Sequence, residues 1–276
     1  MTDQLVAVLH EGVVETSAGV ATGDDAGLVR GDGCFDATLI DASGRVWDLD
    51  EHLERLLHSC ALLHLPAPDL GAWRTLIDEA VAAWSGGEAA LKLVTTRGPE
   101  HGGEPTNFCT ITALTPTMID QREGVSVVTL DRGYSSTTFD GKPWLLGGAK
   151  TLSYAIHTAA RREAAARGAD DVVFTTSDGF VLEAPTAAVV WRVGERYFST
   201  PTGGTGILDS ISRRKVFTGL GDRAGFALGT PEDLMRSDGV WLLSSVRGTA
   251  PVLSLNGAAV AHDADATRRV RDLNGF

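Results

Sequence analysis

The sequence predicts an α+β fold in two domains, for three reasons. Strand-like and helix-like segments mix without the strict alternation that a parallel α/β sheet requires. The length of 276 residues exceeds one average domain. A polar connection at residues 116–123 separates two groups of elements. We therefore expect an N-terminal α+β domain over residues 1–117 and a C-terminal α+β domain over residues 118–276.

The chain is expected to begin with strands. Residues 6–9 form a short apolar run. A turn at residues 42–44 predicts a hairpin between a strand at residues 34–40 and the pair at 46–47.

Helical periodicity replaces this pattern near residue 50. Apolar residues recur there at helical spacing, with Asp50 as a cap, and a second amphipathic helix is expected over residues 73–84. Strands are expected at residues 89–96 and 108–114, separated by a Gly/Pro-rich loop at residues 98–106.

The second half mixes short strands with two helices. Expected strands lie at residues 125–130, 172–176, 181–182, 188–193, 197–200 and, as the final buried strand, 240–245; expected helices lie at residues 153–166 and 210–220.

Composition excludes several classes of function. The formal charge of −12 repels phosphate backbones, which argues against a nucleic-acid partner. The apolar runs are too short to span a bilayer, and the start of the chain lacks a basic region before a long apolar core. Three scattered cysteines, Cys34, Cys60 and Cys109, predict a reducing compartment and no metal site. We therefore expect a cytoplasmic protein.

One lysine and one glutamate suggest pyridoxal phosphate (PLP) chemistry. Lys150 follows small, flexible residues and precedes an expected helix, where its amine can meet a carbonyl compound. Glu183 follows on an expected strand and could keep a pyridine nitrogen protonated. Each residue alone proves little, because an isolated lysine is far more often a solvated surface charge.

A glycine-rich loop at residues 201–206 precedes the helix expected at residue 210. Backbone amides of Ile211 and Ser212 in its first turn could bind a phosphate. A flexible turn with Asp209 or Ser210 as the helix cap is the alternative, and the charge of Asp209 opposes an anion unless it points away.

Four further positions carry candidate anion ligands. Arg97 ends a strand and opens a loop that contains His101, so its guanidinium could fork onto a carboxylate or remain a surface charge. Ser245 and Arg247 lie where a buried strand ends, as turn residues or as ligands.

Arg55 lies in a leucine-lined helix. A solvated face or an ion pair with Glu51 is the simplest interpretation of the sequence at this position.

Seven segments together resemble the fold-type IV PLP enzymes of aminotransferase class IV. In chain order they are GDGCFDATLI (31–40), HLERLLHS (52–59), KLVTTRG (92–98), GAKTLSY (148–154), SDGFVLEAPTAAVVW (177–191), TGILDSISRRKV (205–216) and SSVRGTAPV (244–252). The spacing Lys-x-Leu-Ser-Tyr is most similar to the branch of 4-amino-4-deoxychorismate lyases and D-amino-acid transaminases.

The resemblance implies a fold like that of D-amino-acid aminotransferase, with PLP in the C-terminal domain and a homodimeric assembly. It implies that Lys150 is the catalytic residue and holds the cofactor covalently. It implies cofactor contacts from Arg55, Tyr154, Glu183, Ile211, Ser212 and Ser245, and substrate contacts from Phe35, Arg97, His101 and Arg247.

Phe35 favours one reaction among those that the resemblance allows. D-amino-acid transaminases have a tyrosine at this place, whose hydroxyl holds the substrate carboxylate, whereas the lyases have phenylalanine. We therefore expect a 4-amino-4-deoxychorismate lyase that releases pyruvate and 4-aminobenzoate, a step towards folate. The alternatives are transamination of D-amino acids or branched-chain amino acids, and a PLP-free binding protein.

Overall fold

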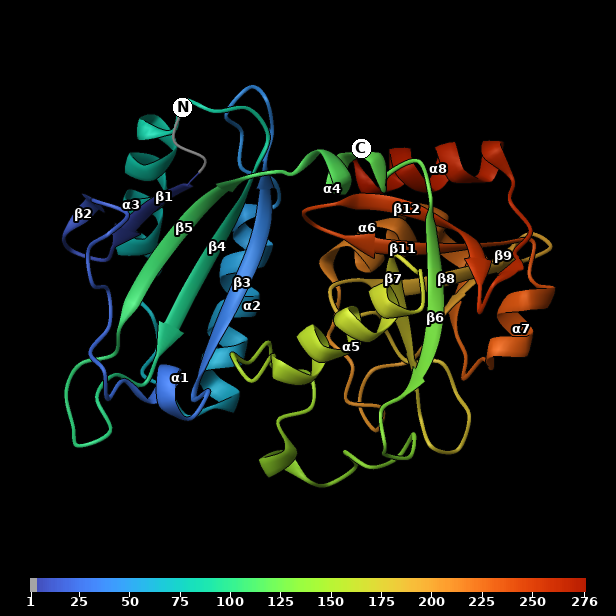
Figure 1. Cartoon of the computed structure of the whole chain (residues 1–276), viewed down its shortest axis with the longest axis horizontal. Helices are drawn as coiled ribbons and strands as arrows, with labels where there is room; N and C mark the ends of the chain where they lie inside the picture. Colours follow the sequence, from blue (N-terminus) through green and yellow to red (C-terminus); the bar gives the residue numbers. More distant parts are fainter. Residues whose placement is uncertain (1–3) are drawn as a thin grey trace. The chain divides into compact units, whose positions relative to one another are not determined.

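The chain forms two compact units in the computed structural model, which describes residues 4–276. Residues 1–3, at which the expected N-terminal domain begins, lie outside the described part. The first unit contains the described residues up to Thr115 and, in addition, Ala149–Tyr154. The second contains Pro116–Gly148 and Ala155–Phe276. Each unit combines helices with a sheet, which confirms the α+β class (Figure 1).

The sheet of the first unit is antiparallel throughout. Its strand order is β2 (Gly12–Val14), β1 (Gln4–Val8), β5 (Asn107–Ala113), β4 (Ala89–Thr96) and β3 (Gly33–Ile40). Helices α2 (Leu49–Leu62) and α3 (Leu70–Ala83) cover one face of it, and the short α1 (Ala26–Val29) precedes β3 (Figure 1).

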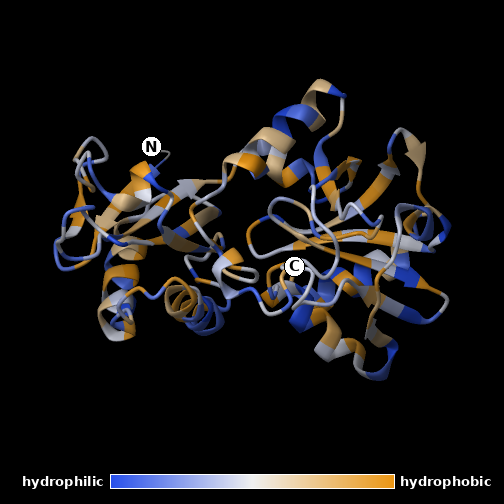
Figure 2. Ribbon diagram, turned by 90° about the horizontal axis from the view of Figure 1, so that it is seen from below, coloured by the Kyte–Doolittle hydropathy of each residue, from blue (hydrophilic) through white to orange (hydrophobic). Residues whose placement is uncertain are grey.

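The core of this unit lies between the sheet and the two helices. Leu53 and Leu56 of α2 are fully buried, as are Trp73 and Ile77 of α3. Full burial of one such side chain stabilises the fold by about 1.5–3 kcal/mol. Figure 2 shows hydrophobic and hydrophilic residues on the same helices, as expected for helices that bury one side.

Both helix starts differ from the expected ones. Helix α2 begins at Leu49, so Asp50 lies within its first turn instead of capping it. Helix α3 begins at Leu70 because the Asp69 side chain accepts hydrogen bonds from the amides of Gly71 and Ala72.

The segment Ala149–Tyr154 is extended along β3, so the helix expected from residue 153 was placed too early. The amide of Phe35 donates to the carbonyl of Lys150 (2.9 Å), and the amide of Leu152 donates to the carbonyl of Gly33 (2.9 Å). Cys34 and Thr151 form an antiparallel bridge. The helix, α5, starts only at Ala155 and ends at Ala166. The result is that the catalytic-lysine candidate is carried on the edge of a sheet.

The second unit is built on a larger mixed sheet. Its strand order is β10 (Ala224–Phe226), β9 (Arg196–Ser199), β8 (Ala188–Val193), β11 (Gly239–Ser244), β12 (Gly248–Leu255), β6 (Val125–Asp131) and β7 (Asp171–Thr175), and β13 (Ala258–Ala259) pairs with β12. Its helices are α4 (Pro116–Asp120), α5, α6 (Ile211–Leu220), α7 (Pro231–Arg236) and α8 (Ala264–Asn274), with 3₁₀ turns at Pro143–Leu145 and Gly221–Arg223.

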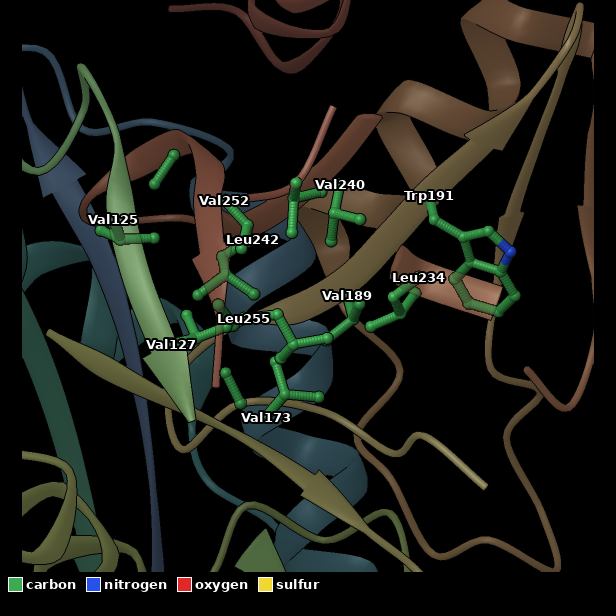
Figure 3. Packing of buried hydrophobic residues seen from close by; sticks show 14 of the residues in the cluster. Val125, Val127, Val173, Val189, Trp191, Leu234, Val240, Leu242, Val252 and Leu255 are labelled. Carbon is green, nitrogen blue, oxygen red and sulfur yellow. The ribbon is translucent and has the colours of Figure 1, made fainter. Parts of the chain in front are cut away.

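Alternate residues of the central strands face opposite sides of this sheet, as strand geometry requires. Val189 and Leu242 belong to one apolar cluster, whose packing Figure 3 shows. Their neighbours Val190 and Leu243 belong to another, which α6 and α8 complete. Helix α5 covers a third cluster around Phe174 on β7.

The expectation that residues 240–245 form the last strand is wrong. Strand β12 follows it, then β13 and helix α8. Residues 181–182, expected as a strand, form only an isolated bridge between Val181 and Thr175. The polar connection at 116–123 contains the short helix α4. Within residues 4–276, no helix is both long and apolar enough to cross a membrane.

Candidate functional site

Lys150 lies beside an aromatic ring in the first unit. Its Nζ is 4.6 Å from the centroid of the Phe35 ring. The Tyr154 ring meets the Phe35 ring edge-on, with centroids 5.4 Å apart. The backbone amide of Lys150 donates to Oγ of the buried Ser59 on α2 (3.2 Å). The structure thus brings three residues singled out in the sequence, Phe35, Lys150 and Tyr154, into one cluster.

A second lysine, which the sequence analysis did not single out, joins this cluster. Nζ of Lys92 on β4 lies 4.5 Å from the centroid of the same Phe35 ring. Burial lowers the pKa of the Lys92 amine. A lysine within an otherwise apolar strand was the available signal. The contact itself depends on β3 and β4 pairing Ala37 with Lys92, which local sequence does not reveal.

Arg55 is held by a buried carboxylate, so both simple interpretations of its sequence context are wrong. Its Nε and Nη2 donate to the two oxygens of Asp36, at 2.8 Å each. His52, one turn earlier on α2, contacts the same carboxylate through Nδ1 (2.7 Å). Burial alone would raise the pKa of Asp36, but Arg55 and His52 hold it well below its ordinary value. Arg55 therefore stands in a fixed orientation on α2.

The guanidinium of Arg97 forms an ion pair with a carboxylate of the same chain. Its Nε and Nη2 contact the two oxygens of Asp32 (2.6 and 3.2 Å), and Nη2 also donates to the carbonyl of Leu63 at the end of α2 (2.8 Å). Hydrogen bonding to Asp32 raises the pKa of Arg97. The loop beyond Arg97 carries His101, which is exposed. The bidentate contact of Arg97 is thus made to Asp32 of the same chain, whereas the resemblance implies a contact with a substrate.

Glu183 lies in the second unit, in a stretch that pairs with β7. The amide of Phe174 donates to its carbonyl (3.0 Å). Its half-buried carboxylate accepts from the amide of Leu208, at 3.3 and 3.4 Å to the two oxygens. Burial and the nearby negative charge of Glu183 raise the pKa of the Tyr134 hydroxyl to about 12. The carboxylate of Glu183 is therefore held at Leu208, three residues before the start of α6.

Ile211 and Ser212 are the first two residues of α6, and both are buried. Amides in the first turn of a helix have no acceptor within that helix, and the dipole favours an anion there. Ser210 caps the helix, because its Oγ accepts from the amide of Arg213 (3.2 Å). The Asp209 carboxylate pairs with Nη2 of Arg213 (2.6 Å), so its charge is compensated by a buried arginine. This pairing answers the objection that Asp209 would repel a phosphate.

Two glycine-rich loops of the second unit meet backbone to backbone. The amide of Gly148 donates to the carbonyl of Gly206 (3.1 Å). A Cβ on Gly147 would lie 2.6 Å from the Phe139 ring, and one on Gly206 only 2.4 Å from it. No side chain fits at either position, which is why the segments before Lys150 and before α6 both need glycine.

Ser245 and Arg247 occupy the turn between β11 and β12. Ser245 is half-buried. The guanidinium of Arg247 is buried and forms an ion pair with Asp171 (2.9 Å), and it also donates to Gln121 (3.1 Å). This geometry favours a structural role for Arg247 over the predicted contact with a substrate carboxylate.

Each unit carries groups whose donor chemistry fits PLP. Lys150 supplies an amine on a sheet edge, and Glu183 supplies a half-buried carboxylate for a protonated ring nitrogen. The start of α6 supplies amide donors for a phosphate, beside the hydroxyl of Ser212. Among the other predicted cofactor residues, Arg55 lies on helix α2.

Comparison with known proteins gives a consistent result. The family model for amino-transferase class IV matches residues 33–255. A bifunctional aminodeoxychorismate lyase / D-amino acid transaminase from Mycobacterium tuberculosis is 36% identical over 266 residues, which cover 92% of each chain.

Solved structures agree in fold over nearly the whole chain. A hypothetical aminotransferase from Mycobacterium tuberculosis with α-ketoglutarate and PMP bound has a TM-score of 0.93 at 35% identity, covering 98% of this chain and 97% of that one. The PLP-bound form of a hypothetical aminotransferase from the same organism has a TM-score of 0.91. A fold IV-transaminase from Curtobacterium pusillum has a TM-score of 0.91 at 35% identity, covering 99% and 97%.

Proposed function

The chain belongs to the amino-transferase class IV family and is a PLP-dependent enzyme, and we propose that it is a 4-amino-4-deoxychorismate lyase. The reaction would release pyruvate and 4-aminobenzoate, a precursor of folate. The observation that supports this choice most is the contact between Lys150 and Phe35. A ring without a hydroxyl stands beside the reacting amine, where a transaminase would hold the substrate's α-carboxylate.

Lys150 is proposed to hold the cofactor and to move the proton. When bound, PLP supplies an electron-withdrawing ring that stabilises negative charge on the carbon that carries the substrate's amine. Nζ of Lys150 would remove the proton from that ring carbon of the substrate. Pyruvate would then leave as its enol, and formation of the aromatic product makes the step irreversible. Ser59 fixes the backbone from which this amine extends.

The remaining cofactor residues are proposed to bind the ring nitrogen and the phosphate of the cofactor and to pack against it. The carboxylate of Glu183 would accept a hydrogen bond from the cofactor's ring nitrogen and keep it protonated. The amides of Ile211 and Ser212 would bind the phosphate, with Arg55 and Ser245 as further donors. Tyr154 would pack near the cofactor from the same segment as Lys150.

The substrate carries two carboxylates, each of which needs a cationic partner. Arg97 stands at the strand end but is engaged by Asp32, and Arg247 is engaged by Asp171. Lys92 is half-buried beside Phe35, and its amine is the cation that we propose for one carboxylate. His101 in the exposed loop is the candidate for the other.

The assay that tests the lyase proposal follows 4-aminobenzoate and pyruvate from aminodeoxychorismate. Equal release of both products is expected, without any second substrate. Absence of both, with exchange of amines between an amino acid and an oxoacid, would show that the lyase assignment is wrong. Borohydride reduction followed by peptide mapping should place the cofactor on Lys150.

Transamination of D-amino acids is the second candidate, because the relative at 36% identity carries both names. Oxoacid formation from a panel of D-amino acids and L-branched-chain amino acids tests it. A PLP-free binding role has no support, since Lys150 and Glu183 are both present in a PLP-dependent family. A cytoplasmic homodimer remains part of the proposal.

A further inference from the structure

We propose that Asp36 is the positioning residue of the phosphate site, acting through Arg55. This inference rests on the proposed role of Arg55 as a phosphate ligand. Asp36 lies on β3 directly after Phe35, and its side chain is completely buried. A fully buried carboxylate is costly unless its charge and lone pairs are satisfied.

The carboxylate of Asp36 receives four hydrogen bonds. Oδ1 accepts from the amide of Ala37 (2.7 Å), from Nδ1 of His52 (2.7 Å) and from Nη2 of Arg55 (2.8 Å). Oδ2 accepts from Nε of Arg55 (2.8 Å). Two parallel bonds to one guanidinium fix both its position and its plane. One ion pair would compensate the charge of Asp36, so these four hydrogen bonds do more than compensate it.

His52 completes the arrangement as a neutral donor. Burial lowers its pKa, although the bond to Asp36 opposes this shift. A neutral imidazole bonded to a carboxylate through Nδ1 has its proton on Nδ1. Its buried Nε2 has no hydrogen-bond partner among the described residues, so Asp36 is the polar group that orients the ring. His52 thus donates a hydrogen bond to Asp36 without adding a second positive charge beside Arg55.

The consequence concerns the orientation in which Arg55 would meet a phosphate. The Asp36 pair uses Nε and one N–H of Nη2, on one edge of the guanidinium. This pair fixes the plane of the guanidinium relative to β3 and α2. Asp36 therefore sets the orientation in which Arg55 would meet an anion, while its own negative charge offsets that of the guanidinium.

Two opposed effects make the proposal testable. If net charge dominated, removing the Asp36 charge would strengthen phosphate binding. If orientation dominates, as we propose, Asp36→Asn weakens it. The measurement is the affinity of the PLP-stripped enzyme for PLP and, separately, for pyridoxal, which has the same ring and aldehyde but no phosphate.

For Asp36→Asn we expect about a tenfold or larger loss of PLP affinity, with pyridoxal affinity within about twofold of wild type. Arg55→Gln should show the same selectivity. The double variant should bind PLP no more than about twofold more weakly than Arg55→Gln, because both changes remove one interaction. Asp36→Glu, which keeps the charge, should recover part of the loss.

Asp32→Asn is the matched control, since Asp32 forms a bidentate ion pair with Arg97 in the same unit, as Asp36 does with Arg55. It should leave PLP affinity within about twofold of wild type. Thermal unfolding of each stripped variant checks that it is folded.

Three results would overturn the proposal: unchanged or tighter PLP binding by Asp36→Asn, equal losses for PLP and pyridoxal, or a double variant with additive losses. Arg55→Gln with normal PLP affinity would instead show that the phosphate assignment itself is wrong. The lyase reaction stands or falls separately, on product formation.

Discussion

The hydroxyl of Ser59 on helix α2 accepts a hydrogen bond from the backbone amide of Lys150 at 3.2 Å. Lys150 is also tied to β3 through its carbonyl, which accepts from the amide of Phe35. Both polar groups of the lysine backbone are therefore engaged. In the catalytic role proposed for Lys150, an amine whose backbone is fixed in this way would not have to be ordered again in each turnover.

Replacing Ser59 with alanine should slow catalysis without preventing covalent attachment of the cofactor. The amide of Lys150 would lose its acceptor, which costs about 1 kcal/mol of unfolding free energy. We expect kcat to fall while borohydride still labels Lys150. Ser153→Ala is the control, because the exposed Ser153 hydroxyl makes only a long bond to the carbonyl of Gly31. Equal kcat values for the two variants would contradict the role given to Ser59.

Replacing Phe35 with tyrosine should shift the balance of reactions. A hydroxyl added beside Lys150 and Lys92 could donate to an α-carboxylate, and a hydrogen bond to a charged group is worth about 1.5–3 kcal/mol. We expect the ratio of D-amino-acid transamination to lyase activity to rise by about tenfold or more. Both activities are measured on the same preparation. An unchanged ratio would show that this ring does not determine the reaction.

Replacing Lys92 with methionine should raise KM for aminodeoxychorismate more than it lowers kcat, because it removes a binding cation. Lys92→Arg keeps the charge and should retain most of the affinity. Burial lowers the pKa of Lys92, so its ammonium loses a proton below the ordinary value of 10.5. Wild-type kcat/KM should therefore fall at alkaline pH earlier than that of Lys92→Arg, whose guanidinium stays protonated. Coincident pH profiles would argue against Lys92 as the carboxylate ligand.

Asp36 should contribute to stability only where it is ionised. Its folded pKa lies below the ordinary value of 3.8, so its contribution is fully present above that pH and is lost as the pH falls towards the folded pKa. Urea unfolding at pH 6 should show a large difference between wild type and Asp36→Asn. The difference should shrink at pH 3. A difference that is the same at both pH values would mean that the Asp36 charge does not stabilise the fold.

Local patterns predicted most strands because those strands are apolar runs bounded by turns. Strand β4 was predicted with its observed ends, Ala89–Thr96, and β8 with Ala188–Val193. Helix α8 was missed because it is mostly polar, and only a narrow stripe around Ala266 and Val270 packs against the sheet. The extended course of Ala149–Tyr154 was missed because pairing with β3 decides it, not the local sequence.

In the candidate site too, local sequence identifies some residues, and contacts distant in sequence decide the others. Lys150 and the first turn of α6 could be found because glycines and a helix start mark them. The partners of the arginines could not, since each is set by contacts distant in sequence: Arg97 with Asp32 is 65 residues apart, and Arg247 with Asp171 is 76. Lys92 could not be identified from local sequence either, because strand pairing places it over Phe35.

The four hydrogen bonds on one buried carboxylate have an evolutionary corollary. Transplanting the α2 helix with its arginine into another scaffold would leave the guanidinium without its anchor. Asp36 on the strand and His52 and Arg55 on the helix therefore depend on one another, and we expect homologues that differ at position 36 to carry compensating changes at 52 or 55. Deep mutational scanning should reveal this epistasis directly.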